Sequence, residues 1–279
     1  MILIADSGST KTDWCLIEGA VVIKQFQTVG INPYFQDSDS ILALVKAEVA
    51  SQLNNSPSAI YYYGTGITDD SKAEIVANVL KKCFVNSHTI EVYSDIVGAA
   101  RSALGKNTGI ACILGTGSNT CFYENGKILF KVDALGFWLG DEGSGGHLGK
   151  ALILAYLHKE MPQDLRSIFI EKYGNLDRLT ILDFAYKQPF PNRYFAGFTP
   201  FLSQHQTHPF CQALIKNSFQ ELFNKYISKY PDYQSFALGF VGSVAWYFKA
   251  ELQEIAQQNQ CKITKIIKSP IEGLIAYHQ

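Results

Sequence analysis

One pattern of short elements occurs twice in this sequence and limits the folds open to it. Residues 1–28 contain an apolar segment, a turn of small and hydroxyl-bearing residues, a second apolar segment, a glycine turn and a third apolar segment, and residues 110–132 repeat that order. Short apolar runs bounded by such turns are typical of β-strands. When the copies are aligned, Gly8 matches Gly117 and Gly19 corresponds to Gly126. We therefore expect two related halves, each built on a three-stranded meander.

The segments that follow each meander alternate between strand and helix patterns. Residues 37–53 begin with serine and aspartate and then place apolar residues at helical spacing, which predicts a helix. The further predicted elements are a strand over 59–67, a helix over 71–84, a strand over 89–95, a helix over 97–105, mostly helix over 160–235, strand, turn and helix over 233–256, and strand, loop and helix over 262–279. This alternation predicts an α/β protein in which parallel strands extend each meander.

Composition limits the class of partner. The chain has 279 residues, of which 47% are hydrophobic and 18% are charged, and this length is comfortable for two lobes. Its apolar runs are too short to cross a bilayer, and its net charge of −1 gives little attraction for nucleic acid. Residues 1–5 lack the basic leader of a secretory signal, and the six scattered cysteines favour reduced thiols. We expect a cytoplasmic protein that binds a small molecule, with no membrane or nucleic-acid partner.

The first candidate site is the turn that ends the opening strand. Its glycine lets backbone N–H groups approach an anion closely, and its hydroxyls and ammonium group add hydrogen-bond donors. The candidate phosphate-binding residues are Ser7, Gly8, Ser9, Thr10 and Lys11. Asp6 would repel phosphate unless a cation such as Mg²⁺ lay between them, and Asp13 could support the same metal. The alternative is a plain hairpin turn whose side chains satisfy nearby backbone groups.

Two further glycine turns have similar potential. The second turn contains Gly115, Thr116 and Gly117, in the same setting as the first, and also suits close approach to phosphate. The third turn, residues 239–243, falls between a predicted strand and a predicted helix. Glycine there allows a flat ligand to lie against the backbone, and the helix N-terminus favours negative charge. An ordinary strand-to-helix turn is the alternative for this third turn.

Taken together, five segments resemble the actin-like sugar kinases and ATPases. In chain order they are DSGSTKTD, SDIVGAARSA, LGTGSNT, LGDEGSGGHLG and LGFVGSVA. The resemblance covers nearly the whole chain and is closest to the group that joins N-acetylglucosamine kinases to BadF/BadG/BcrA/BcrD-type ATPases. It implies two ribonuclease-H-like lobes, residues 1–105 with 266–279 and residues 106–265, with ATP and Mg²⁺ in the cleft between them. The first two turns would bind the phosphates, and Gly239, Gly242 and Ser243 the adenosine.

The same resemblance implies a sugar-binding side. Asp95 ends a predicted strand, and a carboxylate fixed there can take the proton from a sugar hydroxyl that attacks the γ-phosphate. Either Ser94 or Asp95 could instead cap the following helix. The implied acceptor-binding residues are Asn32, Ser118, Asn119, Gly136 and Asp141. Alternatively, Asp141 is a loop acid near a helix start, and Asn32 serves only the turn that contains Pro33.

These patterns lead to one expected function and one rival. We expect an ATP- and Mg²⁺-dependent kinase that phosphorylates an amino sugar, N-acetylglucosamine by preference, with N-acetylmuramic acid or glucosamine as alternatives. The rival is a BadF-type ATPase that acts as an activator or nucleotide sensor without a sugar. Activators with an iron–sulfur cluster are disfavoured, since no cysteine lies between Cys121 and Cys211. Leu135 stands where similar kinases tend to have tryptophan, so the acceptor pocket is expected to differ. A homodimer is common among similar proteins.

Overall fold

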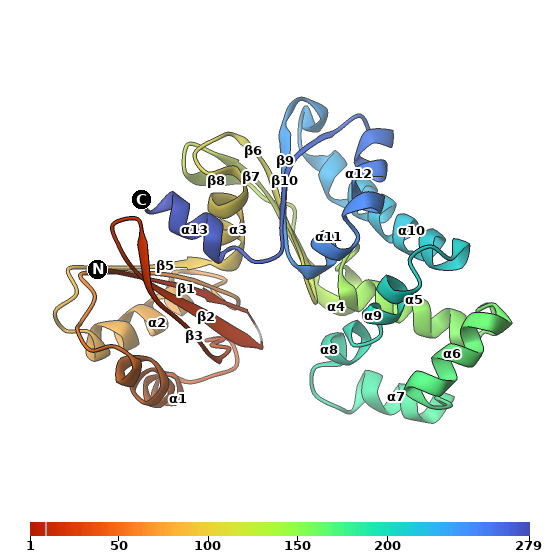
Figure 1. Cartoon of the computed structure of the whole chain (residues 1–279), viewed down its shortest axis with the longest axis horizontal. Coiled ribbons are helices and arrows are strands. Elements are labelled where there is room, and N and C mark those ends of the chain that lie inside the picture. The colour runs from red at the N-terminus through yellow and green to blue at the C-terminus, as the bar shows by residue number, and fades with distance from the viewer. Residues whose placement is uncertain (9) are drawn as a thin grey trace. The chain divides into compact units, whose positions relative to one another are not determined.

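The computed structural model describes residues 1–8 and 10–279 and divides the chain into two units (Figure 1). The first unit comprises Met1–Lys106 and Ser269–Gln279, and the second comprises Asn107–Lys268. Each unit is built on a five-stranded sheet with helices. The predicted α/β class and the predicted pair of lobes are therefore confirmed.

The sheet of the first unit combines a meander with two parallel strands. Its order is β3-β2-β1-β4-β5, in which β1 to β3 are antiparallel, β4 is parallel to β1, and β5 is parallel to β4. The strands are β1 (Ile2–Ser7), β2 (Lys11–Glu18), β3 (Val21–Val29), β4 (Ala59–Gly64) and β5 (Thr89–Ser94). The helices are α1 (Ser38–Leu44) with its π and 3₁₀ continuations Val45–Val49 and Ala50–Gln52, α2 (Asp70–Cys83), α3 (Asp95–Leu104) and α13 (Ile271–Tyr277).

Helices cover both faces of this sheet (Figure 1). Side chains alternate between the two faces of a strand. Leu3 therefore packs in the core formed with α1 and α2, while Ile4 packs in the core formed with α3 and α13. The same alternation places Asp6 on the α3 and α13 face. Helix α13 packs closely on α3, because a β-carbon on Gly273 would lie 2.4 Å from the carbonyl oxygen of Ser102.

The sheet of the second unit repeats the first. Its order is β8-β7-β6-β9-β10, with β6, β7 and β8 antiparallel and with β9 and β10 continuing in parallel from β6. The strands are β6 (Gly109–Leu114), β7 (Ser118–Glu124), β8 (Lys127–Phe130), β9 (Ala237–Val241) and β10 (Lys262–Ile267). The meander repeat predicted from the sequence is therefore present as a repeat of topology.

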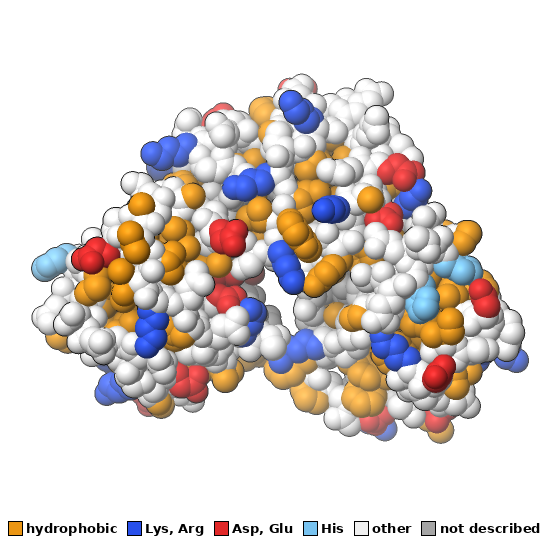
Figure 2. All heavy atoms as spheres, viewed as in Figure 1, with side chains coloured by type: hydrophobic (Ala, Val, Ile, Leu, Met, Phe, Trp, Pro, Cys, Tyr) orange, Lys and Arg blue, Asp and Glu red, His pale blue; other side chains and the backbone are white. Residues whose placement is uncertain are grey.

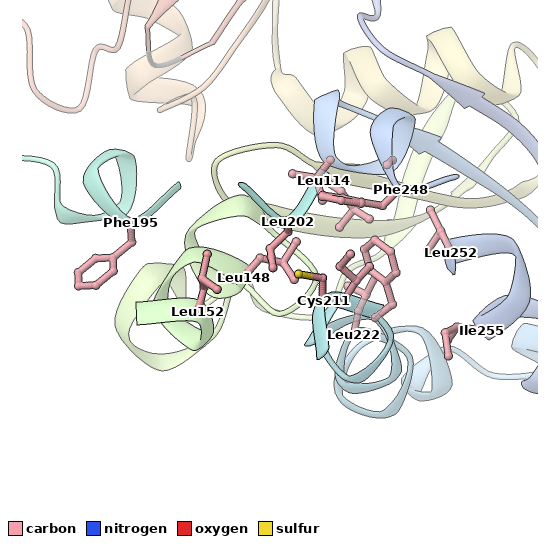
Figure 3. Packing of buried hydrophobic residues seen from close by; sticks show 14 of the residues in the cluster. Leu114, Leu148, Leu152, Phe195, Leu202, Cys211, Leu222, Phe248, Leu252 and Ile255 are labelled. Carbon is pink, nitrogen blue, oxygen red and sulfur yellow. The ribbon is translucent and has the colours of Figure 1, made fainter. Parts of the chain in front are cut away.

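Helices make up most of the rest of the second unit. They are α4 (Gly136–Leu139), α5 (Gly145–Leu157), α6 (Gln163–Tyr173), α7 (Arg178–Tyr186), α8 (Pro191–Ala196), α9 (Thr199–Gln204), α10 (Pro209–Lys225), the 3₁₀ turns Ile227–Lys229 and Tyr233–Ser235, α11 (Ser243–Tyr247) and α12 (Lys249–Gln258). Figure 3 shows their core, where Leu148 of α5, Leu222 of α10 and Leu252 of α12 are buried together with Leu114 of β6. Burying a leucine side chain stabilises a fold by about 1.5–3 kcal/mol, so this cluster anchors the loops around it.

The surface shown in Figure 2 has no large patch of a single charge sign. On the face shown in Figure 2, lysine and arginine side chains are scattered among aspartates and glutamates, with hydrophobic side chains between them. Among the described residues, no helix is both long enough and apolar enough to cross a membrane.

Candidate functional site

Two neighbouring carboxylates act on Asp6 near the end of β1. Asp6 is paired with Asp13 across β1 and β2, and Asp95 is the first residue of α3, directly after β5. Burial raises the pKa of Asp6 to about 7, and the negative charges of Asp13 and Asp95 add to this effect. Asp95 is half-buried, and Ser94 holds the cap position of α3 without a side-chain cap bond. The cap alternative for Asp95 is therefore not what the structure shows.

The donor set at Asp6 fits a hard cation. Asp13 is already paired, because Lys11 Nζ lies 3.0 Å from its carboxylate and Gln27 Nε2 donates to Oδ1 at 2.5 Å. The carboxylate of Asp6 has no hydrogen-bond partner among the described residues, and a cation would stabilise its ionised form. No group of three or more His, Cys, Asp or Glu side chains in residues 1–8 and 10–279 could hold a metal ion. Mg²⁺ typically takes one or two carboxylates and completes its shell with water and phosphate oxygens, so Asp6 suits that ion.

Part of the first turn is committed to the fold. The hydroxyl of Ser7 is fully buried, lies 2.7 Å from Thr12 Oγ1, and accepts the N–H of Ile31 at 3.0 Å. The N–H of Gly8 donates to the carbonyl of Lys11 at 2.9 Å. Gly8 therefore bonds within the hairpin, and the Ser7 hydroxyl bonds both to the hairpin and to the later segment that contains Ile31.

The remaining residues of the first turn differ in what they offer. The side chains of Thr10 and Lys11 are exposed, so both are accessible to an anion. Ser9, a predicted phosphate-binding residue, lies outside the described residues.

Asn32 combines a turn role with an open amide. Its Oδ1 accepts the N–H of Tyr34 at 3.0 Å, which forms the expected turn. Its side chain rests against Gly66, where a β-carbon would lie 2.0 Å from Oδ1 and where φ is +77°. The Nδ2 group has no partner among the described residues and can donate to a ligand. Gly66 belongs to none of the predicted site motifs, although a pair of glycines at a strand end indicates close approach of another segment.

The second turn presents unpaired backbone donors. Gly145 and Gly146, at the start of α5, donate to the carbonyls of Gly115 and Thr116 at 2.8 and 2.9 Å. These bonds fix the turn, yet within the described part of the chain the N–H groups of Thr116 and Gly117 have no partner. Preorganised backbone N–H groups of this kind bind anions.

A pocket of about 390 Å³ opens beside this turn. Its size is within the range of small-molecule sites. Its walls are Gly115, Thr116 and Gly145 at the turn, Ala196, Thr199, Pro200, Ser203 and Gln204 from α8 and α9, and Ser243, Val244, Tyr247 and Phe248 from α11 and its end. The sequence pattern predicts only mostly helix over residues 160–235, so it does not reveal this wall.

The third turn contributes in three different ways. Ser243 lines the pocket, as its predicted ligand contact requires. Gly242 has φ of +127°, and a β-carbon there would lie 2.2 Å from the carbonyl oxygen of Leu114. Gly239 is a buried residue of β9 paired with Ala111, and it does not line the pocket.

Replacement of Gly242 should damage the pocket. In Gly242→Ala, we expect a loss of about 1–3 kcal/mol in the free energy of unfolding and weaker nucleotide binding, because strain and a backbone clash act together. Thermal unfolding and titration with ADP would measure both effects. Gly174→Ala is the matched control, since φ is +79° there but a β-carbon would meet nothing within 4 Å. Equal losses in both variants would contradict the role of the Leu114 contact.

The opposite side of the second turn meets an acidic side chain. Asp141 Oδ1 accepts the N–H of Ser118 at 3.0 Å, and a β-carbon on Gly117 would lie 3.1 Å from both carboxylate oxygens. Burial raises the pKa of Asp141, although the Ser118 bond opposes that shift. Asp141 also has a left-handed backbone, with φ of +62°. The structure thus brings Asp141 and Ser118 together.

Two other predicted acceptor residues are placed less directly. Asn119 follows Ser118 on β7, its side chain is on the opposite face by alternation, and its Oδ1 accepts the N–H of Thr120 at 3.0 Å. Gly136 begins α4 with φ of +70° and has open space around it. Neither residue contacts Asp141 through a described hydrogen bond.

Comparison with known proteins places the chain in a family. No family model and no curated protein matches it. Among solved structures, a protein from Porphyromonas gingivalis described as a candidate N-acetylglucosamine kinase is 40% identical, and the match covers 100% of this chain and 98% of that chain with a TM-score of 0.93.

Two more distant structures share the fold alone. A candidate N-acetylglucosamine kinase from Chromobacterium violaceum is 17% identical over 100% of this chain and 98% of that chain, with a TM-score of 0.75. A ROK family glucokinase from Streptomyces griseus, in complex with glucose and AMPPNP, is 13% identical over 99% and 97%, with a TM-score of 0.56. Because the Porphyromonas protein is 40% identical over the full length, the chain belongs to the N-acetylglucosamine kinase family of actin-like fold.

Proposed function

We propose that this protein is an ATP-dependent kinase that transfers the γ-phosphate to a hydroxyl of N-acetylglucosamine. The observation that carries this proposal is that the second turn contacts both the pocket and the Asp141 carboxylate. Its Gly115 and Thr116 line the nucleotide-sized pocket, while its Gly117 and the adjacent Ser118 meet the Asp141 carboxylate. This arrangement supports a turn that serves both phosphate binding and sugar binding. A nucleotide sensor needs only the first of these features.

The proposed roles follow from the chemistry of each group. The free N–H groups of Thr116 and Gly117 bind phosphate oxygens, with Thr10 and Lys11 as further donors, and Ser243 contacts the nucleoside. The Asp141 carboxylate accepts hydrogen bonds from sugar hydroxyls, and the Nδ2 group of Asn32 donates a hydrogen bond to a sugar hydroxyl. Asp6 would hold Mg²⁺, which neutralises phosphate charge when bound.

In the transfer step, Asp95 is the proposed general base. The sugar oxygen forms a bond to the γ-phosphorus while the bond from that phosphorus to the β-phosphate oxygen breaks, and ADP leaves. The hydroxyl proton passes to the Asp95 carboxylate. The Porphyromonas relative supports N-acetylglucosamine as the acceptor through its description alone.

The test is ADP release from the purified protein with Mg²⁺ and ATP. The panel contains N-acetylglucosamine, N-acetylmuramic acid, glucosamine and glucose, and a no-sugar sample measures hydrolysis. We expect N-acetylglucosamine to stimulate ADP release most strongly and one sugar phosphate to form per ADP. Hydrolysis that ignores every sugar would favour the ATPase or sensor instead, and a stronger response to another sugar would reassign the acceptor.

A further inference from the structure

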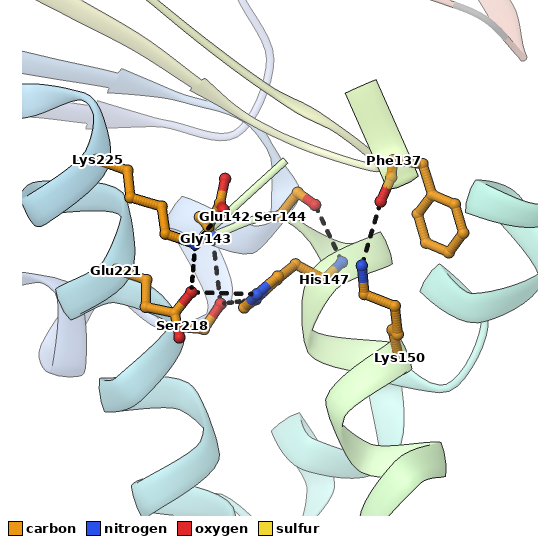
Figure 4. A network of polar contacts seen from close by, with 9 residues as sticks. All are labelled: Phe137, Glu142, Gly143, Ser144, His147, Lys150, Ser218, Glu221 and Lys225. Atoms are coloured by element: carbon orange, nitrogen blue, oxygen red, sulfur yellow. Dashed lines mark hydrogen bonds and ion pairs between the residues drawn. The ribbon is translucent and has the colours of Figure 1, made fainter. Parts of the chain in front are cut away.

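Helix α10 carries a polar stripe on the face that meets the loop over residues 140–144 (Figure 4). Its members are Ser218, Glu221 and Lys225, which helical spacing places on one side of the helix. Leu222 lies among them and packs against the same loop, since a β-carbon on Gly143 would lie 3.1 Å from its Cδ2 atom. The stripe does not line the pocket described above, and none of the proposed chemical steps uses it.

Ser218 holds the loop through two contacts. Its hydroxyl oxygen accepts the N–H of Gly143 at 3.2 Å and lies 2.8 Å from Nδ1 of His147. With neutral His147, the hydroxyl can donate to Nδ1 while it accepts from Gly143, which leaves the Nε2 proton facing Glu221 at 3.7 Å. Burial lowers the pKa of His147, in agreement with the neutral form.

Lys225 holds the residue before Gly143. Its Nζ atom lies 2.6 Å from Oε1 of Glu142 and 3.1 Å from Oε2 of Glu221. Glu142 is 4% exposed, so its charge needs a partner. Burial acts to raise the pKa of Glu142, but the hydrogen bond and positive charge of Lys225, together with hydrogen bonds from the Glu142 backbone and Tyr226, lower the net pKa. The pair is therefore an ionised contact between the loop and α10.

The loop has a backbone that requires such support. Asp141 has φ of +62° and Gly143 has φ of +81°. A non-glycine residue in the left-handed region is costly and persists where surrounding contacts fix it. The two residues that follow Asp141 are those held by Lys225 and Ser218, so the stripe fixes the direction in which the Asp141 carboxylate leaves the backbone.

We propose that Ser218 and Lys225 are positioning residues for the sugar acceptor. They hold the loop that carries Asp141, and they set the affinity for the sugar rather than for the nucleotide. This inference rests on the proposed function for the identity of the acceptor. Positioning errors of about 1 Å are known to cost on the order of 100-fold in catalysis.

Lys225→Met tests the proposal by separating sugar affinity from nucleotide affinity. We expect the KM for N-acetylglucosamine to rise by about 10- to 100-fold. The dissociation constant for ADP should stay within about twofold, because no stripe residue lines the pocket. Ser218→Ala should shift the sugar KM in the same direction, and Lys225→Arg, which keeps the charge, should recover most of the affinity.

Lys216→Met is the matched control. Lys216 lies on the same helix and forms an ion pair of similar length, 2.7 Å, with Glu254 of α12, away from the loop. The KM of Lys216→Met for N-acetylglucosamine should equal the wild-type value. An unchanged sugar KM in Lys225→Met, or equal weakening of sugar and ADP binding, would overturn the inference.

Amide hydrogen exchange keeps the inference separate from the proposed function. In Lys225→Met without any ligand, the segment over residues 140–146 should exchange about tenfold faster than in Lys216→Met, because the loop opens more often. If no sugar stimulates the wild-type protein, the proposed function fails and the exchange result stands alone. Equal exchange in the two variants would overturn the positioning role.

Discussion

Asp95→Asn should lower kcat with N-acetylglucosamine by about 10²- to 10⁴-fold, the range for loss of a general base. The amide has nearly the shape of the carboxylate but cannot take up the hydroxyl proton. The affinity for ADP should be unchanged, since the described residues that line the pocket all belong to the second unit and Asp95 does not. Steady-state kinetics and calorimetric titration with ADP measure these two quantities separately.

A control must account for the position of Asp95 in the first turn of a helix. Asp70 occupies the equivalent place, as the first residue of α2, so Asp70→Asn removes the same charge from the same helical position. We expect wild-type kcat in that variant. Near-normal turnover in Asp95→Asn would exclude Asp95 as the base and return it to a helix-start role.

The parts that could be predicted from the sequence depend on short segments. The meanders could be predicted because short apolar runs and the glycine turns that bound them are local patterns. The pairing of Ser118 with Asp141 was also within reach, because both belong to segments that carry the family resemblance. The topology then places the second turn and the loop over residues 140–144 side by side.

The parts that could not be predicted depend on contacts between distant segments. Nothing near Ser7 in the sequence indicates that its hydroxyl bonds to Ile31, which lies on a later segment. The spacing of Ser218 and Lys225 shows that they share a helical face, but not that Gly143 and Glu142 meet that face. The same holds for the α9 wall of the pocket, whose residues form no motif.

Asp6→Asn should abolish Mg²⁺-dependent activity while making the protein more stable at neutral and alkaline pH. Asp6 has a pKa of about 7 in the folded protein, compared with 3.8 as its ordinary value. Between these values the folded state holds a proton that the unfolded state has released, so stability falls as pH rises. The loss of folding stability caused by ionised Asp6 is absent below about pH 4 and reaches its full value above about pH 7. At 1.36 kcal/mol per pKa unit it reaches about 4 kcal/mol.

The substitution removes this cost because asparagine does not ionise. The gain in unfolding temperature over the wild type should therefore be clearly smaller at pH 5 than at pH 8, where it is largest. Mg²⁺ with ADP should stabilise the wild type and narrow that gain, since a cation at Asp6 offsets the charge that burial penalises.

Asp37→Asn provides a control of opposite sign. The backbone N–H of Ser40, which bonds to the Asp37 carboxylate at the start of α1, lowers the pKa of Asp37, so its charge supports the fold above that pKa. The unfolding temperature of Asp37→Asn should not exceed that of the wild type at any pH. Two results would contradict this interpretation of Asp6. One is a gain in unfolding temperature for Asp6→Asn that is constant from pH 5 to pH 8, and the other is a gain that Mg²⁺ and ADP leave unchanged. Either result would mean that Asp6 is not a carboxylate that lowers stability and is retained to bind a cation.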